Sequence, residues 1–125
     1  MNDTEQIYIQ LVASGINETH GEINFSKVQL EQLVSLCKLH RNAGIVYHGL
    51  IKQENVPQNM IEVFEKGFYT EMMIYSKRMI VFQMVLDALN RQKIKHIIVK
   101  GMSYAKCYPQ TEFRTMGDLD LIICE

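Results

Sequence analysis

Two aspartates near the end of the chain, Asp118 and Asp120, are the residues whose types and spacing most directly suggest chemistry. Side chains two positions apart in a strand point to the same side, so both carboxylates would project together at the start of an apolar run. Leu119, Leu121 and Ile123 would then face the other way, into a core. Adjacent carboxylates are suitable ligands for a divalent cation. The alternative is a strand whose polar first residues lie at the solvent end of a sheet.

A second feature precedes the aspartates: Lys100 and Gly101 follow directly after an apolar, β-branched run. Glycine between a buried strand and a helix lets a ligand approach the backbone, and the start of a helix offers free amide groups. Gly101 therefore suggests a turn that faces a phosphate. Lys100 and Ser103 would add a cation and a hydroxyl, and Arg114 could hold a phosphate oxygen through two hydrogen bonds. The alternative is an ordinary turn glycine beside a solvated lysine.

These residues need a strand, a turn, a short helix and a second strand to position them. Residues 94–99 form a short β-branched run, which is typical of a buried strand. We predict a short helix over 102–108, an ordered loop over 109–115 and a second strand over 118–124. Because two strands alone do not make a stable sheet, we expect the chain to supply only part of a larger one.

The chain before residue 93 is predicted to be helical. Amphipathic patterns indicate helices over about 4–13, from Ser26 as N-cap to about residue 39, and over about 45–51. From Pro57 to about Gln92 there is no second proline and a single glycine. One helix of about 33 residues, roughly 50 Å long, is therefore allowed there.

This long helix carries two apolar stripes. The first repeats at alternating spacings of four and three residues, as a helix-packing seam does. It consists of Phe64, Phe68, Met72, Tyr75, Met79, Phe82, Leu86 and Leu89. The second contains Met73, Ile74, Ile80, Val81 and Val85. Because it widens the apolar face, we expect the helix to pack against several neighbours. The predicted fold class is α+β, with a mostly helical region over 1–92 followed over 93–125 by two strands with a short helix between them.

Composition limits the classes of function. The chain has 125 residues, of which 47% are hydrophobic, and this is enough for a real core. Its formal net charge of -1 gives no overall polyelectrolyte character, so we do not expect nucleic acid as a partner. Arg91, Lys93 and Lys95 form a basic group that could meet an acidic acceptor or a nucleic-acid backbone. No segment has the pattern of a signal peptide or a membrane span.

The cysteines and histidines suggest no further site. Cys37, Cys107 and Cys124 are odd in number and widely spaced, which favours reduced, mostly buried thiols over disulfides or a zinc site. None of the four histidines has a partner at metal-ligand spacing. With no targeting segment, these features predict a cytoplasmic protein without a membrane partner.

Taken together, the motifs resemble a known superfamily. The run 98–101, the pair Tyr108-Pro109, Arg114 and the run 117–122 look like the N-terminal half of a nucleotidyltransferase core of the polymerase-beta type. More narrowly, the chain is similar to a largely uncharacterised bacterial branch. In that branch a Lys-Gly turn replaces the usual Gly-Gly or Gly-Ser, and an arginine precedes the Asp-x-Asp. The helical leader with residues 39–41 and the long helix also look like that branch, so the resemblance spans about residues 30–125.

The resemblance implies a specific site on the start of a nucleotidyltransferase-like sheet. In this superfamily the Asp-x-Asp pair holds divalent metal, usually magnesium, that bridges the nucleoside triphosphate, and the glycine turn contacts its phosphates. By position, Asp118 and Asp120 become the catalytic ligands of Mg²⁺ or Mn²⁺. The residues assigned to the triphosphate are Lys100, Gly101, Ser103 and Arg114.

The activity implied is transfer of a nucleoside monophosphate from a nucleoside triphosphate to an unidentified acceptor. The superfamily also implies a third carboxylate on a later strand. The sequence has no candidate for it, and Glu125 cannot take that place, so we expect the chain to be incomplete or inactive alone. Two alternatives remain open. One is a non-enzymatic helical interaction module with a degenerate half-site, and the other is a homodimer whose copies complete each other's sheet through 118–124.

Overall fold

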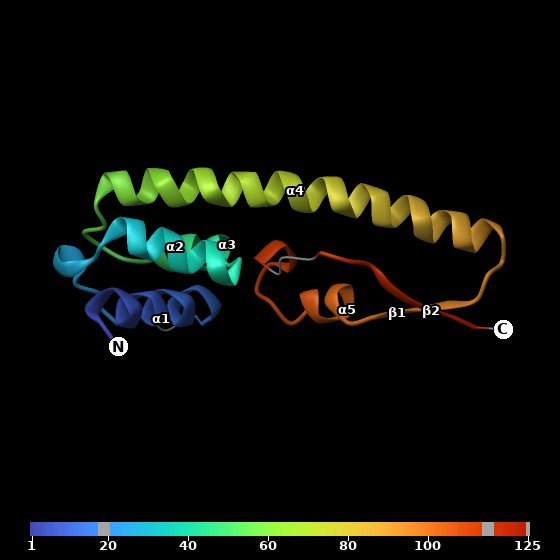
Figure 1. Ribbon diagram of the computed structural model, residues 1–125, viewed down its shortest axis with the longest axis horizontal. Coiled ribbons are helices and arrows are strands. Elements are labelled where there is room, and N and C mark those ends of the chain that lie inside the picture. Colours follow the sequence, from blue (N-terminus) through green and yellow to red (C-terminus); the bar gives the residue numbers. More distant parts are fainter. Residues whose placement is uncertain (18–20, 114–116, 125) are drawn as a thin grey trace. The chain divides into compact units, whose positions relative to one another are not determined.

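The computed structural model describes residues 1–17, 21–113 and 117–124, without the side chains of Met102, Ser103 and Glu112. The chain forms two compact units, Met1–Glu71 and Met72–Glu125, whose boundary falls within the longest helix. Helices come first, and two strands with a short helix between them follow, which confirms the predicted α+β class (Figure 1). The elements are α1 (Asp3–Ile16), η1 (Phe25–Lys27), α2 (Leu30–His40), α3 (Ala43–Leu50), α4 (Gln58–Arg91), β1 (His96–Val99), α5 (Gly101–Ala105), η2 (Thr111–Phe113) and β2 (Asp120–Ile123).

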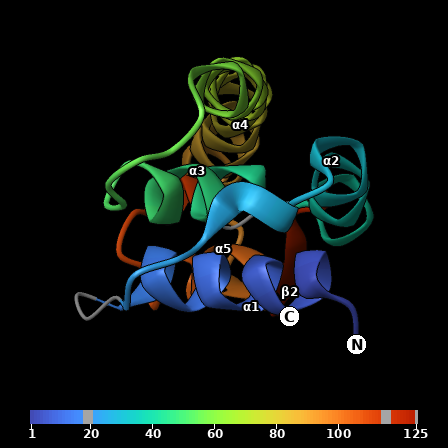
Figure 2. The same ribbon diagram turned by 90° about the vertical axis from the view of Figure 1, so that its left-hand side faces the viewer.

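The first unit is a helical bundle around one apolar core. Figure 2 shows α3 lying between α1 and the beginning of α4. The core side chains come from all four helices and from the segment around η1. They are Ile7, Leu11, Ile23, Phe25, Leu33, Cys37, Val46, Leu50, Met60 and Phe64. The short helices therefore owe their stability mainly to this shared core, because isolated helices of such lengths are marginal in water.

Helices α1 and α3 approach each other closely at two glycines. A Cβ on Gly15 would collide with the carbonyl oxygen of Ile45, and a Cβ on Gly49 would collide with that of Leu11. Only glycine allows the two backbones to lie this near. The prediction that the first helix ends near residue 13 is wrong, because Gly15 continues the helix and serves this contact.

The second helix begins later than predicted. Ser26 is not its N-cap, since it lies inside η1 and its backbone N–H donates to Oδ1 of Asn24 at 3.0 Å. Helix α2 starts at Leu30 instead. The chain just before it is held by α1, because the N–H of Gln29 donates to Oγ1 of Thr4 at 3.1 Å. This tertiary hydrogen bond fixes the residue before the helix, and α2 begins without a side-chain cap.

Helix α4 has 34 residues and confirms the predicted long helix. The predicted seam is its inner face, since every member from Phe64 to Leu89 is buried or half-buried. The second stripe is exposed, with Met73 at 61% and Ile80 at 63%. The prediction that neighbours cover this stripe is therefore wrong for the described residues. The stripe lies in the second unit, where the other helices and strands are short. None of the described helices combines the length and apolar character needed to cross a membrane.

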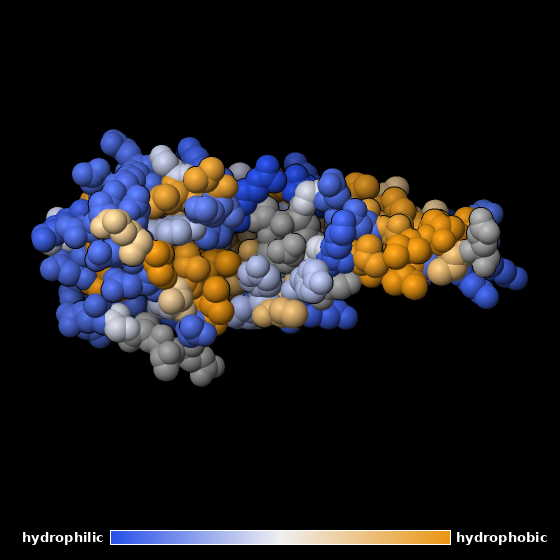
Figure 3. Space-filling view, turned by 60° about the horizontal axis from the view of Figure 1, so that its bottom comes forward, coloured by the Kyte–Doolittle hydropathy of each residue, from blue (hydrophilic) through white to orange (hydrophobic). Residues whose placement is uncertain are grey.

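The second unit contains the small sheet. Strands β1 and β2 pair antiparallel with His96 opposite Ile123, and the N–H of Cys124 extends the ladder to the carbonyl of Lys95 at 2.9 Å. Helix α5 contacts β1 and η2. The prediction of a buried first strand is wrong, because Ile97 is 54% exposed and its neighbours are half-buried. Ile123 is also exposed and does not face a core. Figure 3 shows apolar side chains gathered on the surface at the end where Figure 1 draws these strands.

Candidate functional site

The pairing of β1 with β2 brings the two sequence motifs together. The register places Val99 opposite Asp120, and Lys100 follows Val99 directly. As a result, Nζ of Lys100 lies 3.8 Å from Oδ2 of Asp120. Both side chains are accessible, the lysine 73% and the aspartate 42% exposed. The sheet therefore brings the Lys-Gly turn and the Asp-x-Asp together at the end of the sheet where β1 ends and β2 begins.

The turn after β1 has its exceptional backbone at the lysine and not at the glycine. Lys100 has φ 57° and ψ -125°, whereas none of the described glycines has a positive φ. These angles are close to those of the first central residue of a type II′ turn, a position that glycine normally occupies. For a residue with a Cβ such a conformation costs free energy, of the order of 1–3 kcal/mol. The sequence did not indicate this, because a glycine at position 101 is the residue expected to adopt the special conformation.

The other predicted site residues are placed as follows. Asp118 is exposed and precedes β2, which begins at Asp120, so strand pairing does not itself impose the expected same-side geometry on the pair. Gly101 is the first residue of α5 and is half-buried. The backbone of Ser103 belongs to α5, and its side chain is outside the described part. Arg114 lies outside the described residues, so its predicted role stays a prediction.

Comparison with protein families matches residues 26–125 to a family described as uncharacterised nucleotidyltransferase. This chain belongs to that family. The match includes both the Lys-Gly turn and the Asp-x-Asp, and it confirms the resemblance drawn from those motifs. Searches among curated proteins and among solved structures gave no match. The family assignment therefore fixes the general class of the chain, and the geometry of the site must supply the rest.

The two aspartates of this family member fit a magnesium or manganese ion in their chemistry. Both ions prefer oxygen donors, and magnesium keeps several waters and takes only one or two carboxylates besides phosphate oxygens. Asp118 is exposed and Asp120 is half-buried, so their carboxylates leave room for such additional ligands. Within the described residues no group of three or more histidine, cysteine, aspartate or glutamate side chains could hold a metal ion. The fit therefore rests on two carboxylates.

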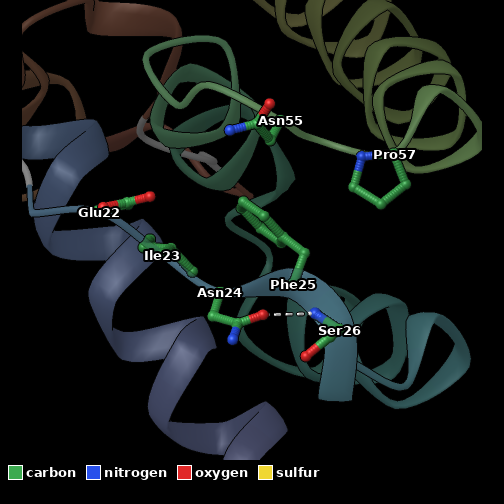
Figure 4. A pocket seen from close by; sticks show the side chains of 7 residues that line it. All are labelled: Glu22, Ile23, Asn24, Phe25, Ser26, Asn55 and Pro57. Carbon is green, nitrogen blue, oxygen red and sulfur yellow. Dashed lines mark hydrogen bonds between the residues drawn. The ribbon is translucent and has the colours of Figure 1, made fainter.

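A separate hollow of about 590 Å³ lies in the first unit of this nucleotidyltransferase-family chain. Figure 4 shows residues that line it, among them Asn55, Pro57, Glu22 and the aromatic ring of Phe25. Among the predicted site residues that the structure describes, none lines this hollow. Its described lining combines one carboxylate, two amides and the hydroxyl of Ser26 with apolar groups, so it offers no pair of carboxylates for a metal ion.

Sequence reasoning also missed a polar cluster between α3 and α4 in the first unit. Oε2 of Glu71 accepts a hydrogen bond from the N–H of Gly44 at 3.1 Å, at the start of α3. Burial raises the pKa of the Glu71 carboxyl, and hydrogen bonds from the backbone of Gly44 and Ala43 oppose that rise. Burial, helped by the charge of Glu71, raises the pKa of the Cys37 thiol to about 12. A glutamate within a long helix gives no sequence signal that its carboxylate caps another helix.

Proposed function

We propose that this chain provides the metal and triphosphate side of a nucleotidyltransferase centre, which transfers a nucleoside monophosphate from a nucleoside triphosphate to a hydroxyl or phosphate acceptor. The observation that carries the proposal is the 3.8 Å contact between Lys100 and Asp120. This contact joins the Lys-Gly turn and the Asp-x-Asp, both within the residues that the family model matches, in one accessible place at the end of the sheet. Membership of the nucleotidyltransferase family supports the general class of reaction.

The proposed roles follow from the chemistry of the side chains. Asp118 and Asp120 hold the divalent cation through carboxylate oxygens, as hard cations require. A divalent cation held there would supply positive charge that offsets the charge of the triphosphate and of the pyrophosphate leaving group. Lys100 adds positive charge for the phosphate oxygens, and Gly101 lets a phosphate approach the backbone because it has no side chain. Ser103 and Arg114 are proposed to add hydrogen bonds to the same phosphates.

The proposal is tested by binding, for which two carboxylates suffice. Isothermal titration of MgCl₂ and ATP into the purified chain should show heat that depends on both components. Asp118→Asn and Asp120→Asn keep the size of the side chains and remove their charge. Even outer-shell partners of metal ligands are worth about 10- to 100-fold in affinity, so each variant should lose at least that much.

A matched control is Asp87→Asn, which removes one carboxylate from the exposed surface of α4. This variant should bind magnesium and ATP as the unchanged chain does. Two results would refute the proposal: no binding of either component to the unchanged chain, or binding that persists in the double variant of Asp118 and Asp120. Either result would favour the helical interaction module.

One observation favours an interaction role beside the proposed catalytic one. In the described chain the two-stranded sheet has exposed isoleucines at Ile97, Ile122 and Ile123, and unpaired strand edges are templates for another strand. A homodimer that pairs these strands between copies would show twice the monomer mass in sedimentation at high protein concentration. A strictly monomeric mass would rule that pairing out.

A further inference from the structure

Lys100 combines two features that the proposed reaction does not by itself require. Its backbone, at φ 57° and ψ -125°, lies in a conformation suited to glycine. Its ammonium pairs with the carboxylate of Asp120, one of the two proposed metal ligands. The chain therefore holds a cationic side chain at a strained position directly against a metal-binding group.

The ion pair contributes little to the stability of the fold. Both side chains are largely accessible to water, and exposed ion pairs are worth only about 0–1 kcal/mol. The strain at Lys100 is of the same size or larger. The ion pair therefore does not exist to stabilise the fold. Its main effect is on the charge of the aspartates, because it neutralises one of their two carboxylates.

We propose that Lys100 is a placeholder cation: it neutralises Asp120 in the metal-free chain and moves to a phosphate of the nucleotide when a divalent cation takes the aspartate. This inference rests on the proposed function, because it assumes that Asp118 and Asp120 bind metal. Asp118 and Asp120 together carry two negative charges, and Lys100 compensates one of them. A divalent cation compensates both and releases the ammonium, whose long exposed side chain can then turn toward the phosphates.

The proposal predicts effects of opposite sign for metal and for nucleotide. Lys100→Met removes the charge and keeps most of the aliphatic chain. Without its competitor, Asp120 should bind Mn²⁺ alone roughly two- to five-fold more tightly, the factor that corresponds to one exposed ion pair. The same variant should bind Mg²⁺-ATP about tenfold or more weakly, because a charged hydrogen bond to phosphate is lost. A residue with a merely structural role would shift both affinities in the same direction.

The experiment measures free Mn²⁺ by electron paramagnetic resonance and nucleotide binding by calorimetry, on the full chain. Lys100→Arg keeps the positive charge, so it should not show the paired change of tighter Mn²⁺ and weaker Mg²⁺-ATP binding that is expected of Lys100→Met. Lys106→Met removes a charge from an exposed position after α5 and should change neither. Should Lys100→Met fold poorly by circular dichroism, Lys100→Gly removes the same charge and also suits the backbone.

Two failures can be told apart. An Mn²⁺ affinity that is unchanged or lower in Lys100→Met and Lys100→Gly would overturn the placeholder role while leaving the metal site intact. Asp120→Asn is measured both alone and together with Lys100→Met. If it lowers the Mn²⁺ affinity in neither case, the proposed function itself is wrong. Tighter Mn²⁺ binding together with weaker Mg²⁺-ATP binding supports the placeholder role.

Discussion

Replacing the helical glycines by alanine should have opposite effects at different positions. Alanine is favoured over glycine inside a helix by about 0.8–1.0 kcal/mol. At Gly67 in α4 the added Cβ would meet only the Cβ of Ala43 at 3.9 Å, an ordinary contact. Gly67→Ala should therefore stabilise the first unit by nearly the full helix-propensity difference.

Gly49→Ala should instead destabilise that unit. Its Cβ would collide with the backbone carbonyl of Leu11, and a backbone cannot turn away as a long side chain can. Overpacking of this kind costs about 1–3 kcal/mol. Both glycines lie in helices and share the same propensity gain on replacement, so the two variants should differ by about 1–3 kcal/mol in free energy of unfolding. Gly15→Ala, which meets the carbonyl of Ile45, should behave like Gly49→Ala.

The free energies of unfolding are measured by urea denaturation, followed by far-ultraviolet circular dichroism. Gly21→Ala is the neutral control for the procedure, since its Cβ would meet nothing within 4 Å and it lies outside the helices. If Gly49→Ala and Gly67→Ala change the stability by the same amount, then α1 and α3 do not approach as closely as described, and the explanation of the first helix's length is wrong.

The remaining predictions concern the polar cluster of the first unit. The raised pKa of Glu71 means that the folded state binds the Glu71 proton more tightly than the unfolded state does. The contribution of Glu71 to stability therefore falls as the pH rises from about 4.5, the ordinary pKa of the group, through the raised pKa of the folded state. Glu71→Gln keeps an acceptor for Gly44 and should gain stability relative to the unchanged chain across that window, in urea titrations at several pH values; a constant difference would contradict the assignment. Cys37 is buried with a pKa of about 12, whereas Cys107 and Cys124 are exposed, so a thiol reagent at pH 8 should modify two cysteines quickly and the third only on unfolding. Fast reaction of all three would show that the core around Cys37 opens readily.

The exposure of the cysteines corrects one sequence expectation in an instructive way. All three are free thiols, as expected, but only Cys37 is buried. Burial could be predicted where a periodic pattern identifies a packed face, as it does for Phe64, Phe82 and Leu86 on α4. Cys107 and Cys124 lie outside such a pattern, and the general preference of cysteine for the interior was the wrong guide there.

The strands illustrate a different limit. A β-branched run correctly predicted the first strand and an apolar run the second, because strand propensity is a local property. The same runs look alike whether or not another layer covers them, so the sequence could not reveal that Ile97 and Ile123 are exposed in the described chain. The sequence therefore predicted the two strands correctly but not the exposure of their side chains.

The candidate site was partly predictable for a similar reason. The types of Asp120, Lys100 and Gly101 and the apolar runs beside them were enough to identify the two motifs and to expect them near one another. The register that sets Val99 opposite Asp120 could not be predicted, because it depends on how two separate strands pair. Nor does a lysine signal a positive φ, because lysine seldom adopts one.

The first folded unit begins before the family match does, at Met1. The match starts at residue 26, after α1. Yet α1 supplies Ile7 and Leu11 to the core and meets α3 through the two glycine contacts. The N–H of Gly44 in α3 in turn donates to the Glu71 carboxylate on α4. Within the first unit, one continuous set of contacts therefore ties the beginning of α4 to α1. The residues before the match are therefore part of the structural support of α4 and not a dispensable leader.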